Sequence, residues 1–202
     1  MYDVPGIVIS AAVEGLTDQA VTQRLIQHIG AQPGQVYGRE GKDHLRARIQ
    51  GYNNAARQSP WLVLVDLDHT YECAASLRAD WLPRQTQASR LCFRVAVRSI
   101  EAWLLADAAG IAAFLGVSAS KVTPMPESLP NPKAALVSLA QSSRKRELRL
   151  DMVPTASSGR QIGPAYTSRL IQFISEHWQP DVASQRSDSL KRAIQCLRQL
   201  AV

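Results

Sequence analysis

Apolar residues along the chain gather in short continuous runs separated by segments of mixed polarity. Residues 6–13 read GIVISAAV, and residues 61–68 read WLVLVDLD with two aspartates at the end. Runs of this length and continuity are typical of strands that are buried on both faces of a sheet. Residues 91–99 predict a third strand of this kind, and residues 35–37 predict a shorter one.

Segments with helical spacing lie between these runs. Thr17 is placed to cap a helix that Gly30 ends, and a more polar helix is expected over residues 43–55. Residues 100–115 carry the apolar stripe of an amphipathic helix. Strands that alternate with helices predict an α/β fold with a mainly parallel sheet and helices on both faces.

The pattern changes after residue 116. Four prolines fall within residues 122–133, which excludes a regular helix or strand there. We therefore predict an α/β catalytic domain over residues 1–120 and a basic helical C-terminal extension over residues 121–202 that packs on it. The helices expected in this extension cover residues 132–141, 164–178 and 188–200.

Acidic side chains stand where three of the predicted strands end. Ligand sites in parallel α/β sheets collect at the carboxyl ends of the strands, so we expect these acids to meet at one edge. Crowded carboxylates repel one another unless cations neutralise them or some stay protonated. Hard oxygen ligands suit Mg²⁺ or Mn²⁺. The set consists of Glu14, Asp18, Asp66, Asp68 and Glu101, with Ser99 two residues before the last of them.

The spacing within this set indicates how the metals would be held. In an extended backbone, the alternation of Asp66 and Asp68 places both carboxylates on one side, where they can share one ion or hold two. Asp18 is expected at a helix N-terminus, where the helix dipole favours its ionised form. An isolated Asp-x-Asp is more often a cap or a turn, but acids after three successive apolar strands favour a metal site. The chemistry indicated is the hydrolysis of a phosphodiester with two bound ions.

The sequence resembles the Toprim domain, which occurs in topoisomerases, DnaG-type primases and the OLD (overcoming lysogenization defect) nucleases. That resemblance implies a metal-binding Glu after the first strand, matched by Glu14, and an Asp-x-Asp after a later one, matched by Asp66 and Asp68. The closer similarity is to the OLD-like branch, whose longer motifs correspond here to Glu14 with Asp18 and to Ser99 with Glu101. The segments VEGLTDQA, VLVDLD and AVRSIEAWLLAD also resemble a bacterial family of small stand-alone Toprim-like proteins that are often encoded beside an ABC-type ATPase.

The resemblance covers roughly residues 6–135 and assigns roles to individual residues. It implies that Glu14, Asp66 and Asp68 hold the principal metal, while Asp18, Ser99 and Glu101 help to hold a second. OLD-like nucleases also use a lysine downstream of the acids, for which Lys133 is the candidate and Lys42 or Lys191 are the alternatives. The chain contains no GxxxxGK[ST] motif, so a nucleotide-driven step would need a partner such as an ABC-type ATPase.

The charge is unevenly distributed. The chain has 23 Lys+Arg and 17 Asp+Glu, a net +6, and all of the excess lies in residues 121–202, which hold 12 basic and 6 acidic residues. A basic surface favours polyanionic partners, although most basic runs are simply solvated. The residues that we expect to contact nucleic acid are Lys42, Arg144, Lys145, Arg146 and Arg149.

Several other features favour ordinary structural roles. Arg94 and Arg98 alternate along one predicted strand, where they either neutralise the acids or hold phosphate, or else form structural ion pairs. His69 is best explained as a polar loop residue. The aromatic residues Trp103, Phe114, Tyr166, Phe173 and Trp178 lie at helical spacing, which favours core packing over base stacking.

The three cysteines are far apart, which indicates reduced thiols and a cytoplasmic protein rather than a disulfide framework. The apolar stretch over residues 102–117 is too short to span a bilayer, and the N-terminal segment lacks the basic region of a secretory signal. No membrane partner is expected.

The sequence therefore predicts a Mg²⁺-dependent (or Mn²⁺-dependent) OLD-like nuclease of bacterial phage defence, acting on DNA or RNA. Its expected partners are the nucleic acid, an ABC-type ATPase and a second copy of the chain. Two alternatives remain open: a non-catalytic Toprim-like subunit that binds nucleic acid or a nucleotide within an ATPase complex, and a phosphoesterase acting on small molecules.

Overall fold

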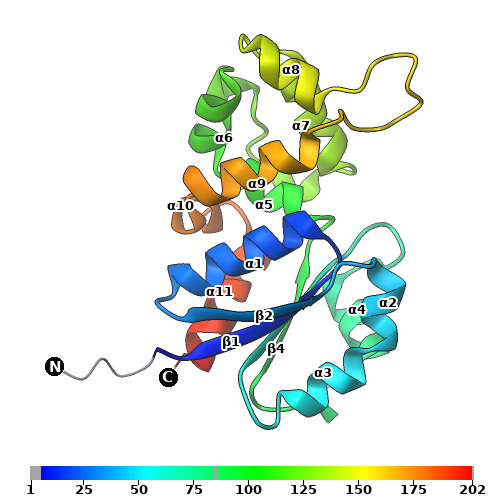
Figure 1. Cartoon of the computed structure of the whole chain (residues 1–202), viewed down its shortest axis with the longest axis vertical. Coiled ribbons are helices and arrows are strands. Elements are labelled where there is room, and N and C mark those ends of the chain that lie inside the picture. The colour runs from blue at the N-terminus through cyan, green and yellow to red at the C-terminus, as the bar shows by residue number, and fades with distance from the viewer. Residues whose placement is uncertain (1–5, 84–85, 202) are drawn as a thin grey trace, which may run out of the picture.

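The computed structural model describes residues 6–83 and 86–201 of the chain (Figure 1). Its strands are β1 (Val8–Val13), β2 (Gln32–Gly38), β3 (Trp61–Asp66) and β4 (Leu91–Ala96). The helices of the N-terminal part are α1 (Leu16–His28), α2 (Lys42–Ala47), α3 (Ile49–Ala55), α4 (Ala74–Trp81), α5 (Ile100–Ala106) and α6 (Ala108–Leu115). The 3₁₀ turns η2 (Ala119–Lys121) and η3 (Pro126–Ser128) lead to α7 (Pro132–Gln141), α8 (Arg146–Met152), α9 (Tyr166–Glu176), α10 (Pro180–Ser184) and α11 (Asp188–Leu200).

The four strands form one parallel sheet in the order β2-β1-β3-β4. The predicted α/β fold with a parallel sheet, helices on both faces and C-terminal helices is confirmed, and it is consistent with a Toprim-like architecture. Because all the strands run the same way, their carboxyl ends meet at one edge of the sheet. That edge carries the turns after Val13, Gly38, Asp66 and Ala96.

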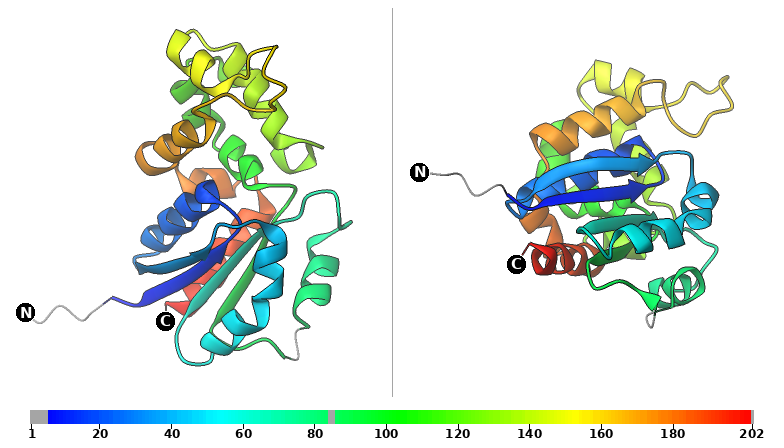
Figure 2. Two further views of the ribbon diagram at one scale, coloured as in Figure 1. Left: turned by 45° about the vertical axis from the view of Figure 1, so that its right-hand side comes forward. Right: turned by 60° about the horizontal axis from the view of Figure 1, so that its bottom comes forward.

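Alternate residues of each strand enter two separate hydrophobic clusters, one on each face of the sheet. In β3, Leu62 and Leu64 pack with α1, α5, α9 and α11, whereas Val63 and Val65 pack with α2, α3 and α4. Both faces of β3 are therefore covered, which explains why its sequence is continuously apolar. Figure 2 shows the sheet between these two helical layers.

The C-terminal helices cover the same face as α1. Helix α9 packs along α1, and α11 packs on β4. Residues of the N-terminal and the C-terminal segments, among them Trp103 of α5 and Phe173 of α9, belong to one hydrophobic cluster. Helices α6, α7 and α8 extend beyond the sheet at the top of Figure 1. The aromatic residues for which core packing was expected, Trp103, Phe114, Tyr166, Phe173 and Trp178, are buried.

Two of the expected helices are interrupted. The segment over residues 100–115 breaks at Asp107, whose side chain accepts hydrogen bonds from the backbone N–H of Gly110 at 2.9 Å and of Gln179 at 3.0 Å. Asp107 thereby caps α6, and the chain turns there. The polar helix expected over residues 43–55 divides at Arg48 into α2 and α3.

Several expected element ends differ by a few residues. The strands β3 and β4 end at Asp66 and Ala96, so Arg98 does not lie in a strand as expected but in the following turn. Helix α1 begins at Leu16, so Thr17 is inside it and Gly15 is the cap residue. Helix α4 was not predicted from the sequence, because its apolar residues form no continuous stripe.

Among the residues that the structure describes, no single helix has the length and apolar character to cross a membrane. One pair of helical segments, Ala108–Leu115 and Ala119–Ser128, meets the requirement of length and composition together, but the two are bent by 114°.

Candidate metal and phosphate site at the carboxyl edge

Tight turns shape the carboxyl edge of the sheet. Gly38 has a φ of 86°, and a Cβ there would lie 2.2 Å from the Val13 carbonyl oxygen, so only glycine fits. Arg39, Asp68 and Arg98 have φ angles of 73°, 53° and 64° and are the non-glycine residues with positive φ in the described part of the chain. All three lie within two residues of a strand end. Left-handed backbone outside glycine is unfavourable and tends to gather at functional sites.

Two hydrogen bonds hold the predicted acids Glu14 and Asp66 at the ends of three strands. The backbone N–H of Asp66 donates to Glu14 Oε1 at 2.8 Å, and the N–H of Ile100 donates to Asp66 Oδ1 at 3.0 Å. These two bonds connect the ends of β1, β3 and β4. We call the group made by Glu14, Asp18, Asp66, Asp68, Ser99 and Glu101 the carboxyl-edge site.

Two polar atoms of this group are buried without a partner. Asp18, in the first turn of α1, is 8% exposed, and its Oδ1 has no hydrogen-bond partner. Ser99, the residue before α5, is 9% exposed, and its Oγ also has none. Leaving a buried carboxylate oxygen or hydroxyl unsatisfied costs about 1–3 kcal/mol, so each such group requires an explanation.

Two residues of the C-terminal segment reach Glu101, which is 4% exposed in the first turn of α5. The Tyr166 hydroxyl donates to Glu101 Oε1 at 3.4 Å, and Lys133 Nζ lies 3.7 Å from the same oxygen. The structure thus brings Lys133 next to the acids. Tyr166 was expected only to pack in the core, and no local sequence signal connects it to Glu101, which is 65 positions away.

Lys42 approaches the site from the N-terminus of α2. Its Nζ lies 2.9 Å from Asp68 Oδ2 and also donates to the carbonyl oxygens of Asp66 and Leu67. Gly41, with a φ of 90°, donates its N–H to the Glu14 carbonyl oxygen at 3.1 Å, which fixes this turn beside β1. Lys42 was expected to contact nucleic acid or to serve in place of Lys133, and the structure places its side chain, only 18% exposed, against Asp68 at the site.

The Asp-x-Asp spacing predicted that strand alternation would place Asp66 and Asp68 on the same face. The structure does not have this arrangement. The strand ends at Asp66, and Asp68 adopts the left-handed conformation. Its backbone exchanges contacts with Arg98: the Asp68 N–H donates to the Arg98 carbonyl at 2.9 Å, and the Arg98 guanidinium donates to the Asp68 carbonyl at 2.9 Å. Asp68 is therefore held at the rim of the site, with its side chain 49% exposed.

Crowding and burial make three of the acids hard to ionise. Burial, followed by repulsion from Glu14, raises the pKa of Asp18 to about 7. Burial raises the pKa of Asp66 well above its usual value, and repulsion from Asp18, Glu101, Glu14 and Asp68 adds to this. Burial also raises the pKa of Glu14, although its hydrogen bond from Asp66 and the charge of Lys42 oppose the shift. The site holds more carboxyls than its two lysines could balance if all were ionised, so some stay protonated unless a cation binds.

The donors of this group are the oxygen ligands that Mg²⁺ and Mn²⁺ prefer. In the described part of the chain, however, no three or more His, Cys, Asp or Glu side chains are arranged to hold a metal ion. Part of the donor set is engaged elsewhere, since Asp66 accepts from Ile100 and Glu14 accepts from Asp66. The chemistry of the donors and the two unpartnered oxygens fit divalent cations, and the metal assignment stays a prediction.

The predicted basic run lies apart from these contacts, in and before α8. Lys145 Nζ donates to the Phe114 carbonyl at 2.8 Å, and Arg149 donates to the Ser143 carbonyl, so both side chains support the fold. Arg144 and Arg146 are exposed. Lys191 is exposed on α11, and none of its described contacts involves the acids, whereas Lys133 and Lys42 both reach them.

Comparison with known proteins gives a family. Residues 13–195 match the family model described as "Domain of unknown function (DUF4276)". The chain therefore belongs to this family. No curated protein and no solved structure matches it significantly.

Proposed function

We propose that this member of the DUF4276 family is a nuclease of the Toprim, OLD-like type that uses Mg²⁺ or Mn²⁺ to hydrolyse phosphodiester bonds of nucleic acid. The observation that carries the proposal is the pair of unpartnered buried oxygens, Asp18 Oδ1 and Ser99 Oγ, among carboxylates whose pKa values are raised. A cation would satisfy the unmade contacts and would stabilise the ionised form of these crowded carboxyls.

The proposed division of roles follows the residues. Glu14, Asp66 and Asp68 would hold the principal ion, and Asp18, Ser99 and Glu101 would help to hold a second. Bound divalent ions supply activation of a water molecule and neutralisation of charge at the phosphate. Hydrogen bonds donated by the Ile100 N–H to Asp66 and by the Tyr166 hydroxyl to Glu101 keep these two carboxyls in place.

The lysines are proposed to meet the substrate. Lys133 has a half-exposed side chain, 48%, and lies at the rim beside Glu101, where it can stabilise charge that develops on a phosphate oxygen. Lys42 is more enclosed and holds Asp68 and the β3 turn, which is a positioning role. Arg144 and Arg146 remain candidates for contact with a longer nucleic acid, because both side chains are exposed.

The setting proposed is a bacterial phage-defence system in the cytoplasm. The three cysteines are free, as is typical of reducing compartments. An ABC-type ATPase and a second copy of the chain are the proposed protein partners. The phage-defence setting and the protein partners rest on the resemblance to OLD-like nucleases, and the cytoplasmic location rests on the free cysteines. None of them depends on the chemistry of the carboxyl-edge site.

The test is incubation of purified protein with supercoiled plasmid, single-stranded DNA and RNA in Mg²⁺, Mn²⁺ or EDTA. We expect metal-dependent cleavage that Asp66→Ala and Asp68→Ala abolish. Asp188→Ala is the matched control, because Asp188 is an exposed carboxylate whose partner is Arg192 on the same helix. If no substrate is cut and the site variants match the control in every assay, the nuclease proposal fails.

The same assay separates the two alternatives. Cleavage of small chromogenic phosphodiesters or mononucleotides without cleavage of any polymer would indicate a small-molecule phosphoesterase. Binding of nucleic acid or nucleotide that survives EDTA, with no cleavage, would indicate a non-catalytic subunit. The unpartnered oxygens of Asp18 and Ser99 favour the nuclease, since a module that binds without metal has no need of them.

A further inference from the structure

Strand β4 is one of the two edge strands of the sheet, and no described strand pairs with its outer side. The carbonyl oxygens of Arg90 and Ala96 accept hydrogen bonds from Trp61 and Leu67, both at 2.9 Å, on the β3 side. In a parallel ladder the bonding side alternates with each residue. The backbone N–H and C=O groups of Phe93 and Val95 therefore face outward.

Side chains cap both ends of this outer side. Gln87 Nε2 donates to the Leu91 carbonyl at 2.8 Å, and the Val97 N–H donates to Ser189 Oγ at 3.3 Å. Between the two caps, no hydrogen bond within the described chain reaches the outward groups of Phe93 and Val95. Unpaired N–H and C=O groups along a sheet edge are a template for a further strand.

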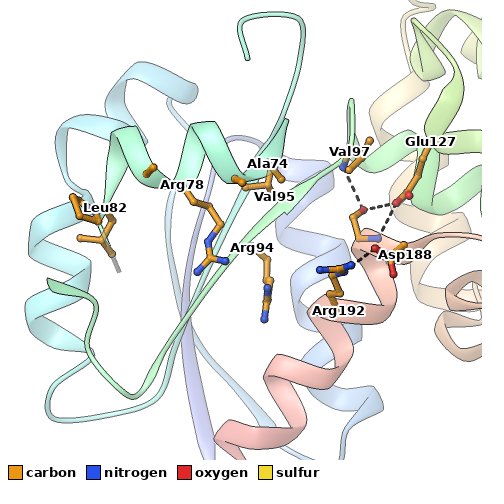
Figure 3. A pocket seen from close by; sticks show the side chains of 13 residues that line it. Ala74, Arg78, Leu82, Arg94, Val95, Val97, Glu127, Asp188 and Arg192 are labelled. Carbon is orange, nitrogen blue, oxygen red and sulfur yellow. Dashed lines mark hydrogen bonds and ion pairs between the residues drawn. The ribbon is translucent and has the colours of Figure 1, made fainter. Parts of the chain in front are cut away.

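A groove gives access to this edge. Its volume is about 520 Å³, and its walls come from α4 on one face of the sheet, from α11 on the other, and from β4 between them. We call it the β4 groove; Ala74, Arg78, Arg94, Val95, Val97 and Arg192 are among the residues that line it. Figure 3 shows β4 running between the two helices. A gap between the two helical layers beside an edge strand is the place where the next strand of such a sheet would lie.

Three arginines and two carboxylates line the β4 groove, so arginine is in excess there. Arg94 extends from β4, and its Nε is buried without a hydrogen-bond partner. Burial disfavours its charge, but the thiols of Cys92 and Cys196 interact with its guanidinium and raise the pKa of Arg94, and no described carboxylate forms an ion pair with it. Arg78 enters from α4, with its guanidinium 5.9 Å from the centre of the Phe93 ring. The carboxylates of the groove are already satisfied: Glu127 accepts from Ser187 at 2.6 Å, and Asp188 pairs with Arg192 at 2.7 Å.

We propose that the β4 groove binds an extended acidic segment of a partner protein as a fifth strand of the sheet. A peptide backbone offers a donor for each outward C=O and an acceptor for each outward N–H of Phe93 and Val95. A phosphodiester offers acceptors only, so both carbonyls would stay unpaired. A second copy of β4 would bring its own Arg94 and Arg78, and the like charges would oppose pairing. The groove reaches this edge at Arg94, Val95 and Val97, whereas Phe93 is 1% exposed, so at about 3.3 Å per residue the edge accommodates about four residues.

The experiment is a fluorescence-anisotropy titration of the full chain with a labelled seven-residue peptide in which Glu alternates with Thr and Val. Two matched peptides serve as controls: one has Lys in place of every Glu, and the other has Pro at alternate positions, which removes backbone donors. We expect the acidic peptide to bind at least about tenfold more tightly than either control, with affinity that falls as salt rises.

Two variants of the chain locate the binding. Arg94→Glu should weaken the acidic peptide at least about tenfold, while Arg57→Glu, an equal charge reversal on an exposed residue elsewhere, should change it less than about twofold. Val95→Pro removes one outward N–H and no ladder bond, because the Val95 N–H points away from β3. Proline is tolerated at such a position of an edge strand. It should also weaken binding, by about fivefold or more.

Three results would overturn the proposal. One is equal binding of the acidic and basic peptides. Another is a peptide affinity that neither Arg94→Glu nor Val95→Pro changes, with both variants folded by circular dichroism. The third is tighter binding of inorganic phosphate or AMP that displaces the peptide, which would make the groove a small-anion site.

Discussion

The carboxyl-edge site and the β4 groove contain unpartnered buried atoms on groups of opposite charge type, carboxyls at the first and an arginine at the second, although β4 contributes to both. At the carboxyl edge, carboxylates are crowded and Asp18 has a buried oxygen without a partner. In the β4 groove, the guanidinium of Arg94 has a buried Nε without a partner. A buried polar atom left without a hydrogen bond costs about 1–3 kcal/mol. The difference in sign teaches that the two places would be completed by different ligands: cations and phosphate at one, a carboxylate-bearing peptide at the other.

The largest expected effect comes from measuring both nucleic-acid cleavage and peptide binding on one variant of each site. Asp66→Asn should lower nucleic-acid cleavage by about a thousandfold, because it removes a proposed metal ligand, and should leave peptide binding within about twofold. Arg94→Glu should weaken peptide binding at least about tenfold and leave the cleavage rate within about twofold. Cleavage rates and anisotropy titrations on both proteins measure this contrast. If either variant impaired both activities while its melting temperature stayed unchanged, the two sites could not be independent.

The two lysines at the carboxyl edge should differ in what they support. Lys133→Met should lower the cleavage rate by about a hundredfold with a stability change within about 0.5 kcal/mol, because its side chain is half exposed. Lys42→Met should also lower stability by about 1–2 kcal/mol, since Lys42 bonds two carbonyls and Asp68. Single-turnover kinetics and urea unfolding separate these effects. An active Lys133→Met variant would move the proposed phosphate contact to Lys42.

Metal should stabilise the fold through the carboxyl edge alone. At a Mn²⁺ concentration about a hundred times the dissociation constant, binding adds about 2.7 kcal/mol, which corresponds to about 5–10 °C in the melting temperature of a chain of this size. Differential scanning fluorimetry with and without Mn²⁺ measures the shift. Asp66→Asn should lose it, and Arg94→Glu should keep it. An equal shift in Asp66→Asn would place the ion elsewhere.

Without metal, stability should fall as the pH rises. Glu14, Asp18 and Asp66 have raised pKa values, so the folded chain binds more protons than the unfolded chain. The stability linked to these protons is complete below about pH 4, the unfolded pKa, and is lost as the pH approaches the folded pKa of Asp18, about 7.

Asp18→Asn provides the control for this pH effect, because its amide never ionises. In EDTA it should be more stable than the parent at pH 8 by about 1 kcal/mol or more, and the difference should shrink towards pH 4. Urea unfolding across this range measures it. A parent chain whose stability rises from pH 4 to pH 8 relative to Asp18→Asn would contradict the raised pKa.

The sequence was sufficient for features that depend on local pattern. The apolar runs predicted the strands that form the centre of the sheet, and acids at strand ends predicted which side chains meet at one edge. Features that depend on long-range contacts were not predictable. The contact of Tyr166 with Glu101 joins α9 to α5, and the left-handed turns at Asp68 and Arg98 support each other across two strands. The open edge of β4 also follows from strand order, which no local pattern contains.

The most direct measurement for the central claim is a count of bound ions. Free Mn²⁺ gives an electron paramagnetic resonance signal that is lost on binding, so titration of the full chain yields the number bound. The account predicts about two Mn²⁺ per chain at the proposed two-ion site, with clear losses in Glu14→Gln and Asp66→Asn and none in Asp188→Asn. Binding that is absent from the parent chain, or unchanged in Glu14→Gln and Asp66→Asn, would contradict a metal site at the carboxyl edge.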